Sequence, residues 1–179
     1  MTINFHESKL VANFQDLLEL LKNDNVPHRA NPEQQSVEIP TQSGSLEGEL
    51  LILWDARSSL VQCIHPLPFE VPEDRIPAAE SAISRINHAL TLPGFGLNHV
   101  SRLLYYRLSV PRRDDGTLSA QELQRLFRTT VSTAADFYLP LLGVVLEGKN
   151  PEQVMAEATL EKTNSSLKSD TPTQGNNAS

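Results

Sequence analysis

The sequence predicts an α+β domain built on an antiparallel sheet of about five short strands, flanked by helices. In some stretches apolar residues recur every three or four positions, as in amphipathic helices. Shorter stretches alternate with a period of two or are continuously apolar, as in strands. The connections between neighbouring strand-like stretches are too short for a parallel crossover, which favours antiparallel pairing. In chain order, the patterns give one helix, three strands, a helix, two strands and a helix.

Proline marks the limits of the first two helices. Apolar residues at helical spacing predict an amphipathic helix over residues 8–25, and Pro27 ends it because proline cannot continue the hydrogen-bond ladder. A second helix is predicted over 73–90. Pro77 fits its first turn, where a missing N–H costs little.

A third, long helix is predicted to start at Ser119. Ser119 and Glu122 have the spacing of a capping box, in which the two side chains reciprocally satisfy free backbone N–H groups. Pro140 is expected to kink or break this helix. A short last helix is predicted over 150–159, because an asparagine followed by a proline is a common helix start.

Five stretches have the character of strands: 36–39, 50–54, 60–64, 94–98 and 103–110. The first is expected to lie at an edge of the sheet, with only Glu38 and Pro40 to protect it against pairing with another chain. The second is continuously apolar, so Trp54 at its end is expected to be buried. Pro66, Pro68 and Pro72 are expected to close the third strand.

Composition indicates one domain over residues 1–160 and a disordered polar tail over 161–179, which is rich in Ser, Thr, Asn and Gly. No stretch approaches the ~20 apolar residues of a membrane helix, and the first residues lack the pattern of a signal peptide. Cys63 is the single cysteine and cannot form an internal disulfide. We therefore expect a cytoplasmic protein that does not bind membranes.

The charge of the chain is unevenly distributed. The formal net charge is −7, which argues against nonspecific nucleic-acid binding by the whole molecule. Between residues 94 and 135, however, six arginines face only three carboxylates. Such clusters are most often solvated surface, but they can also steer a charged partner. The candidate partner-binding residues are therefore Arg102, Arg107, Arg112, Arg113, Arg125 and Arg128.

Few residues have the spacing of a metal or catalytic site. Cys63 and His65 would share one strand face, with His88 and His99 as the other conceivable zinc ligands, but no paired Cys or His spacing supports them. A buried cysteine and a strand-end histidine are the favoured interpretation. An unrecognised enzyme would require His65, His88 and His99 to cluster with a carboxylate in a cleft.

Other short patterns also have simpler explanations. Gly94-Phe95-Gly96 lacks the third glycine and the preceding strand of a dinucleotide loop, so its glycines are expected to allow close backbone approach in a strand or turn. Asp114-Asp115-Gly116 lacks the alternating ligands of a calcium loop and is expected to be a turn. Tyr105 and Tyr106 could stack on nucleic-acid bases, but alternation places them on opposite faces. We expect no cofactor, no metal and no catalytic residue.

One run of residues resembles a known family. It consists of Ile86-Asn87, Leu92-Pro93-Gly94-Phe95-Gly96-Leu97, Leu104-Tyr105-Tyr106-Arg107-Leu108, Ser119, Glu122 and Ala135-Asp136-Phe137-Tyr138-Leu139-Pro140. Together with the order of elements, this run resembles the YbjN-like family of bacterial sensory-transduction regulators over about residues 8–148. The family fold is similar to that of the type III secretion chaperones, which are small acidic dimers that bind an unfolded segment of a client protein. The resemblance implies a binding or regulatory domain, and it supplies no catalytic residue.

The functional expectation is a non-enzymatic protein-binding module of bacterial type. A homodimer is expected, both because closed twofold dimers dominate soluble oligomers and because the resembled chaperones are dimers. The partner would be a protein of unknown identity, held on an exposed sheet or helix face. A small-ligand regulatory domain is the main alternative, and it would require a deep pocket between sheet and helices.

Overall fold

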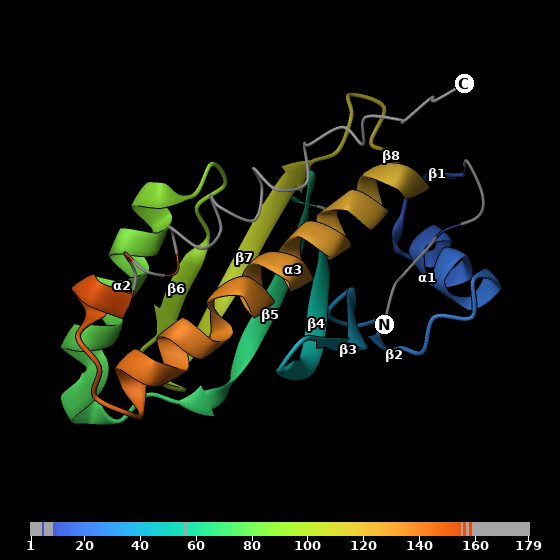
Figure 1. The fold of residues 1–179 in the computed structure, drawn as a ribbon. Helices are drawn as coiled ribbons and strands as arrows, with labels where there is room; N and C mark the ends of the chain where they lie inside the picture. Colours follow the sequence, from blue (N-terminus) through green and yellow to red (C-terminus); the bar gives the residue numbers. More distant parts are fainter. Residues whose placement is uncertain (1–4, 6–8, 56, 155, 157, 159–179) are drawn as a thin grey trace, which may run out of the picture.

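The computed structural model describes residues 5, 9–55, 57–154, 156 and 158, so the tail expected over 161–179 lies outside the described part. The chain forms a six-stranded antiparallel sheet in the order β2-β3-β4-β5-β7-β6 and a two-stranded sheet of β1 and β8 (Figure 1). The elements are β1 (Leu10–Val11), α1 (Phe14–Asn23), β2 (Arg29–Asn31), β3 (Ser36–Ser43), β4 (Leu46–Asp55), β5 (Leu60–Glu70), the 3-10 helix η1 (Glu73–Arg75), α2 (Ile76–Ala89), β6 (Phe95–Asn98), β7 (Leu103–Pro111), β8 (Leu118–Ser119) and α3 (Ala120–Val145). The predicted α+β class is confirmed.

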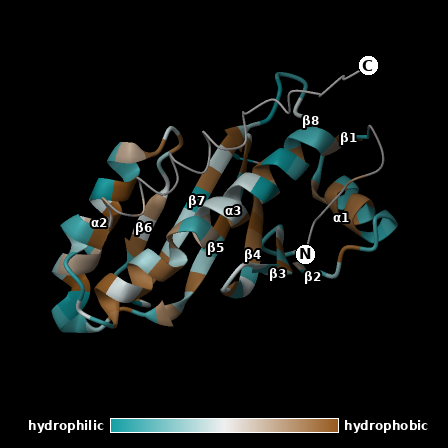
Figure 2. Cartoon of the chain, viewed as in Figure 1, coloured by the Kyte–Doolittle hydropathy of each residue, from teal (hydrophilic) through white to brown (hydrophobic). Residues whose placement is uncertain are grey.

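The helices cover one face of the six-stranded sheet. Helix α3 runs diagonally across that face over β3, β4, β5 and β7, while α1 packs near the β2 end and α2 near the β6 end (Figure 1). The strands show bands of hydrophobic and hydrophilic residues (Figure 2). On β4, Leu50, Ile52 and Trp54 are buried beneath the helices, whereas Leu51 and Leu53, which point to the other face, are only partly buried. The expected burial of Trp54 is confirmed.

The core under α3 has two apolar clusters. The first joins α1 to β3, β4 and the N-terminal half of α3, and the second joins α2 to β6, β7 and the C-terminal half of α3. On β5, the buried His65 stands between Cys63 of the first cluster and Leu67 of the second. Thr41 and Thr130 are also buried polar residues, and the Thr41 hydroxyl lies 2.9 Å from Nε2 of His65. The long helix α3 therefore ties two apolar centres into one domain.

The third predicted strand is longer than expected. Pro66 and Pro68 do not end it, and β5 continues to Glu70. The described register of β4 with β5 ends at the pair Leu51 and Ile64, and beyond it β5 pairs with β7 across an irregular register. Proline can occupy a strand where the ladder on one side has stopped, because no partner there needs its N–H.

The edges of the sheet also differ from the expectation. The short strand β2, which the sequence patterns did not reveal, pairs with Ser36–Glu38 and takes the edge position that β3 was expected to hold. Pro40, which has no N–H to donate, follows in β3 just beyond that pairing. At the opposite side β6 pairs with Leu103–Tyr106, and β7 ends in another proline, Pro111. Both edges are therefore short or interrupted by proline, which limits pairing with another chain.

The helix limits were predicted with mixed success. Helix α1 begins only at Phe14, because the Asn13 side chain accepts a hydrogen bond from Asp16 N at 3.0 Å and caps the helix there. The capping box of α3 is confirmed: Ser119 Oγ accepts from Glu122 N at 3.2 Å, and Glu122 Oε2 accepts from Ser119 N at 2.7 Å.

Pro140 does not break α3, which continues to Val145. Phe137, Leu141 and Val144 on either side of it are buried in the second cluster, and this packing holds the helix together through the missing hydrogen bond. Within the described residues, no helix is both long and apolar enough to cross a membrane.

Candidate functional site

The six arginines proposed from the sequence do not form one surface. Three of them contact nearby side chains of the fold. Arg102 forms an ion pair with Glu70 near the end of β5, and Arg113 lies 3.1 Å from Glu122 at the start of α3. The guanidinium of Arg112 lies 5.1 Å from the centroid of the Trp54 ring, where it can stabilise the edge of the core by a cation–π contact.

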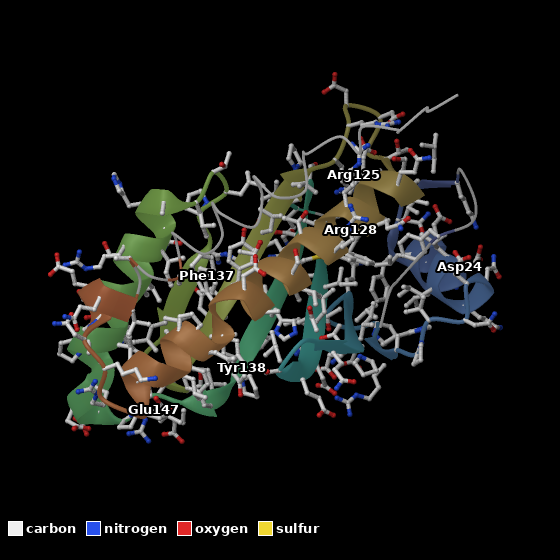
Figure 3. The ribbon with its side chains drawn as sticks, viewed as in Figure 1. Asp24, Arg125, Arg128, Phe137, Tyr138 and Glu147 are labelled. Carbon is white, nitrogen blue, oxygen red and sulfur yellow. The ribbon has the colours of Figure 1, made fainter. Side chains whose placement is uncertain are left out.

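The other three arginines lie on two sides of the molecule. Arg107 is exposed on β7 and alternates with Tyr106, which is buried under the helices, so Arg107 lies on the face of the sheet without helices. Arg125 and Arg128 are exposed along the N-terminal half of α3, where Figure 3 labels both. No ion pair joins Arg107, Arg125 or Arg128 to another described residue. All three residues are exposed, and Arg107 lies 5.9 Å from the centroid of the Tyr105 ring.

Arg125 borders a groove between β7 and the first turns of α3. The groove has a volume of about 270 Å³, and its lining residues are Leu92, Leu108, Val110, Pro111, Leu118, Glu122, Arg125, Leu126 and Thr129. Strand β6 pairs with β7 only as far as Tyr106. Leu108 and Val110 lie beyond this last pair and form the apolar floor of the groove. Leu92 adds a large apolar side chain that is 51% exposed.

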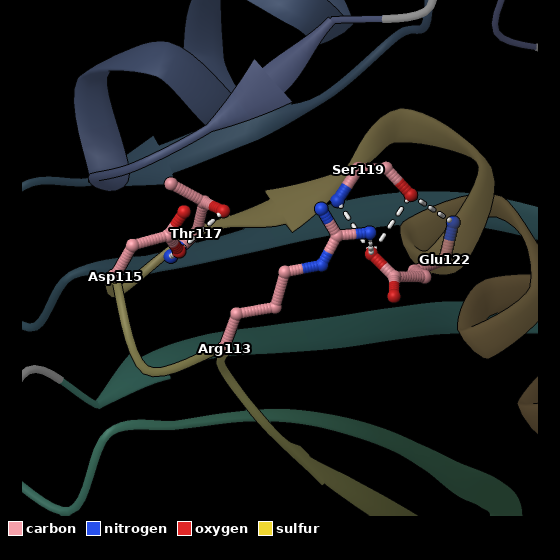
Figure 4. A network of polar contacts seen from close by, with 5 residues as sticks. All are labelled: Arg113, Asp115, Thr117, Ser119 and Glu122. Carbon is pink, nitrogen blue, oxygen red and sulfur yellow. Dashed lines mark hydrogen bonds and ion pairs between the residues drawn. The ribbon is translucent and has the colours of Figure 1, made fainter.

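Polar contacts within the loop before α3 and at the start of that helix are shown in Figure 4. Asp115 Oδ1 accepts hydrogen bonds from the backbone N–H and the hydroxyl of Thr117, at 2.9 and 2.7 Å. These two bonds, more than Arg113, hold the pKa of Asp115 below its usual value. The turn expected at Asp114-Asp115-Gly116 is thus a short, locally bonded connection that delivers Leu118 and the capping box to the end of the groove.

The carboxylate of Glu122, at the groove, is already bonded to Ser119 and Arg113. The backbone N–H and then the hydroxyl of Ser119 lower the pKa of Glu122, and Arg113 lowers it further. Its charge is offset by Arg113, which leaves Arg125 as the unpaired charge among the groove residues and Arg128 one turn farther along α3. The groove therefore combines an apolar floor with a positive rim.

The candidate metal and catalytic residues are not brought together. His88 and His99 are exposed, and His99 lies 3.3 Å from Glu80 on α2. His65 is buried, and its Nδ1–H donates to the carbonyl oxygen of Pro66 at 2.9 Å. Burial raises the pKa of the Cys63 thiol, which disfavours the nucleophilic thiolate. Among the described residues, no group of three His, Cys, Asp or Glu side chains could hold a metal ion.

A second hollow lies at the C-terminal end of β4. It has a volume of about 590 Å³, and its lining residues are Pro32, Glu33, Gln34, Gln35, Leu53, Trp54, Asp55, Arg57 and Gln62. Many of these are exposed residues of the β2–β3 turn and of the β4–β5 turn. This hollow is not the pocket between sheet and helices that a small-ligand domain was expected to have.

Comparisons with known proteins identify the family. The family model described as "Putative bacterial sensory transduction regulator", YbjN, matches residues 15–142, which is more than half of the chain. The chain belongs to the YbjN family. A solved structure from E. coli, "Crystal structure of YbjN, a putative transcription regulator", is similar with a TM-score of 0.50 and 12% sequence identity, covering 88% of this chain and 97% of that chain. No curated protein sequence matches the chain.

In this YbjN chain, the residues that carried the family resemblance serve structure. Asn87 on α2 donates from Nδ2 to Phe95 O at 2.9 Å and accepts from Phe95 N at 3.0 Å, which joins α2 to β6. A Cβ on Gly94 would clash with the carbonyl oxygen of Arg107, so only glycine permits this close backbone approach. Tyr106 donates from its hydroxyl to Leu92 O at 2.8 Å and thereby holds the loop that borders the groove.

The sequence patterns did not reveal the apolar part of the groove. The strand predicted over 103–110 includes Leu108 and Val110, but the sequence could not show that the neighbouring strand β6 pairs with β7 only as far as Tyr106. The one available signal was Leu92, a large apolar residue between Thr91 and Pro93 in a loop where polar residues are usual.

Proposed function

We propose that this YbjN chain is a non-enzymatic, cytoplasmic regulatory module that binds a protein segment in the groove between β7 and α3. The single observation that carries the proposal is the groove itself, in which an apolar floor lies beside arginines that no described carboxylate neutralises. The segment would insert one large apolar side chain against Leu108 and Leu126. Acidic residues next to that side chain would lie near Arg125 and Arg128.

The chemistry of the rim supports an acidic partner. Arginine presents a fork of donors that matches a carboxylate, and two arginines one turn apart on a helix can engage two acidic residues of a flexible segment. The rim is exposed, so these contacts are expected to accelerate association more than they tighten the complex. The apolar floor would supply most of the affinity, because its side chains leave water when the segment binds.

The residues that line the groove favour binding over catalysis. They include neither histidine, cysteine nor serine, and the one carboxylate, Glu122, is already bonded to Ser119 and Arg113. A general base or nucleophile would need a free, correctly positioned group. The similarity of the family fold to chaperones that hold an unfolded client segment, inferred from the sequence, supports the same proposal.

The experiment measures binding of labelled peptides by fluorescence anisotropy. One peptide places a leucine or phenylalanine between aspartates and glutamates, and its control replaces each carboxylate by the corresponding amide. We expect the acidic peptide to bind more tightly and to lose affinity as salt is raised. Equal binding of the two peptides would contradict the proposed rim.

Three variants localise the binding. The double variant Arg125→Glu/Arg128→Glu is expected to weaken the acidic peptide by about tenfold or more, since like charges now face each other. Leu92→Asp should also weaken it, because a carboxylate would replace an exposed apolar side chain at the groove. Arg85→Glu on α2, where Arg85 is paired with Glu152, is a charge reversal outside the groove and should bind like the unaltered chain. Binding that is insensitive to the changes at Arg125, Arg128 and Leu92 would place the site elsewhere.

A further inference from the structure

The face of the sheet opposite the helices has an apolar centre. Leu51 on β4 and Ile64 on β5 are register partners, and both point away from α3. Leu53 lies two residues farther along β4 on the same face. The described helices lie on the other face of the sheet (Figure 1), and these three residues belong to its two central strands. These three side chains are partly exposed, so a partner that covered them would remove further apolar surface from water.

The two flanks of this centre carry opposite charge. On β3, Glu38 Oε2 lies 2.9 Å from Arg29 Nη2, and the same nitrogen lies 2.6 Å from Glu49 Oε1, so two carboxylates share one guanidinium and the flank is net negative. On β7, Arg107 forms no ion pair with another described residue, and its guanidinium lies 5.9 Å from the centroid of the Tyr105 ring.

One row across the sheet contains all these features. Glu38 is the register partner of Leu51, Leu51 of Ile64, and Ile64 of Arg107. The row therefore reads acidic, apolar, apolar, basic from β3 to β7. At its acidic end Arg29, the register partner of Glu38 on β2, neutralises one of the two carboxylates Glu38 and Glu49. If a second copy of the row is laid on the first in the reverse order, acidic residues face basic residues and apolar residues face apolar residues. We call the surface centred on this row the open face.

We propose that the open face binds the open face of a second copy of this chain, around a twofold axis that runs parallel to the strands between β4 and β5. In this arrangement Leu51 packs on the partner's Ile64, and Glu38 faces the partner's Arg107. Both contacts occur twice, as twofold symmetry requires. The two sheets would pack nearly aligned, which is a common geometry for stacked sheets.

Two orientations of a twofold axis would bring the open faces together, and the charges favour the one parallel to the strands. A twofold axis in the same plane but perpendicular to the strands would place β3 on the partner's β3. The acidic flanks would then meet each other, and Arg107 would meet the partner's Arg107. Like charges in contact across an interface are unfavourable, so only the axis parallel to the strands is complementary.

The size of the open face is adequate for a dimer. The six strands have between three and eleven residues each. With strands spaced about 4.8 Å apart and about 3.3 Å per residue, the face of the sheet has an area of about 700 Å² in each copy. Interfaces of standard size bury about 600–1,000 Å² per partner, so the dimer would have to cover nearly the whole face. The edges of the sheet offer less, because they are short or interrupted by Pro40 and Pro111.

Two charge-reversed variants test the proposal without touching the core. Glu38→Arg and Arg107→Glu each place like charges opposite one another in the homodimer, so each should raise the dimer dissociation constant by about tenfold or more in sedimentation experiments. Mixed in equal amounts, the two variants should form a heterodimer. In that heterodimer the two substituted side chains face each other with opposite charge, and so do the unaltered Glu38 and Arg107. Circular dichroism confirms that each variant is folded.

The outcomes separate this inference from the proposed function. Arg128→Glu lies on the helical side and should leave the dimer intact, whereas Glu38→Arg and Arg107→Glu should leave binding of the acidic peptide intact. A strict monomer at the highest attainable concentration would overturn the open-face dimer. A dimer that neither charge reversal weakens, or a mixture without heterodimer, would overturn it equally.

Discussion

The two faces of the six-stranded sheet differ in what covers them, and β4 shows the difference residue by residue. Trp54 points towards the helices and is 3% exposed, while its neighbour Leu53 points to the open face and is only partly buried. Both residues have a register partner on β5, Gln62 for Leu53 and Val61 for Trp54. The helices, together with Arg112 over the Trp54 ring, lie on the side of Trp54 alone.

This difference is the basis on which we propose different tasks for the two faces. The covered face buries two apolar clusters, so most of the free energy of folding should come from it. The open face retains apolar side chains that folding alone does not require there, which is the reason to assign it to assembly. The groove lies where the covered face reaches its limit, at Leu108 and Val110. Binding surfaces are thus expected where the helices stop.

The largest expected effect concerns the covered face. Trp54→Ala should lower the free energy of unfolding by about 3–5 kcal/mol, as truncation of large core side chains does. The change also removes the ring on which Arg112 lies. Urea denaturation monitored by far-ultraviolet circular dichroism measures it. A loss as small as that of an exposed residue would show that the covered face does not carry the stability.

A smaller, pH-dependent effect is expected from His65, a buried titratable group on the covered face. Burial lowers the pKa of His65, and the hydrogen bond to the Pro66 carbonyl offsets this only in part. The unfolded chain therefore binds the proton more readily than the folded one. By linkage, the stability contributed by neutral His65 is present above about pH 6.5 and is lost as the pH falls towards its lowered folded-state pKa.

The measurement is urea denaturation of the unaltered chain and of His65→Gln at a series of pH values between about 5 and 8, above the range in which ordinary carboxylates titrate. Glutamine can still bond Thr41 but does not titrate in this range. The stability difference between the two proteins should change in favour of His65→Gln as the pH falls. A constant difference would contradict the assigned burial of a neutral imidazole.

Sequence periodicity predicted the elements well because an element that is buried on one side has apolar residues at regular spacing in the sequence. The alternation of β7 and the capping box of Ser119 and Glu122 both depend on residues close in sequence, and both are confirmed. The short strand β2 was missed because its three residues, Arg29–Asn31, are all exposed and carry no apolar pattern. Pairing with β3, not its own composition, makes it a strand.

The candidate site was less accessible to sequence analysis for a similar reason. Clustering of arginines in the sequence could not show that Arg102 and Arg113 are paired with carboxylates, or that Arg107 and Arg125 lie on opposite sides of the sheet. The row from Glu38 to Arg107 spans four strands, and its charge order depends on every register in between. Such an arrangement appears only when the strands are aligned in space.

The smallest expected effect concerns the open face, and it depends on concentration. In dilute solution Leu53→Ala should lower the free energy of unfolding by only about 1 kcal/mol, because the leucine is already partly in contact with water before the chain unfolds. If the open face is buried between two copies, the same change should cost more at high concentration, where the dimer prevails and its dissociation is linked to unfolding. Denaturation of the unaltered chain and of Leu53→Ala, at low and at high protein concentration, gives the cost of the substitution in the monomer and in the dimer.

A cost close to that of Trp54→Ala in the monomer would mean that the two faces are equally covered. A cost that is small and independent of concentration would remove Leu53 from the dimer contact and confine that contact to the row from Glu38 to Arg107.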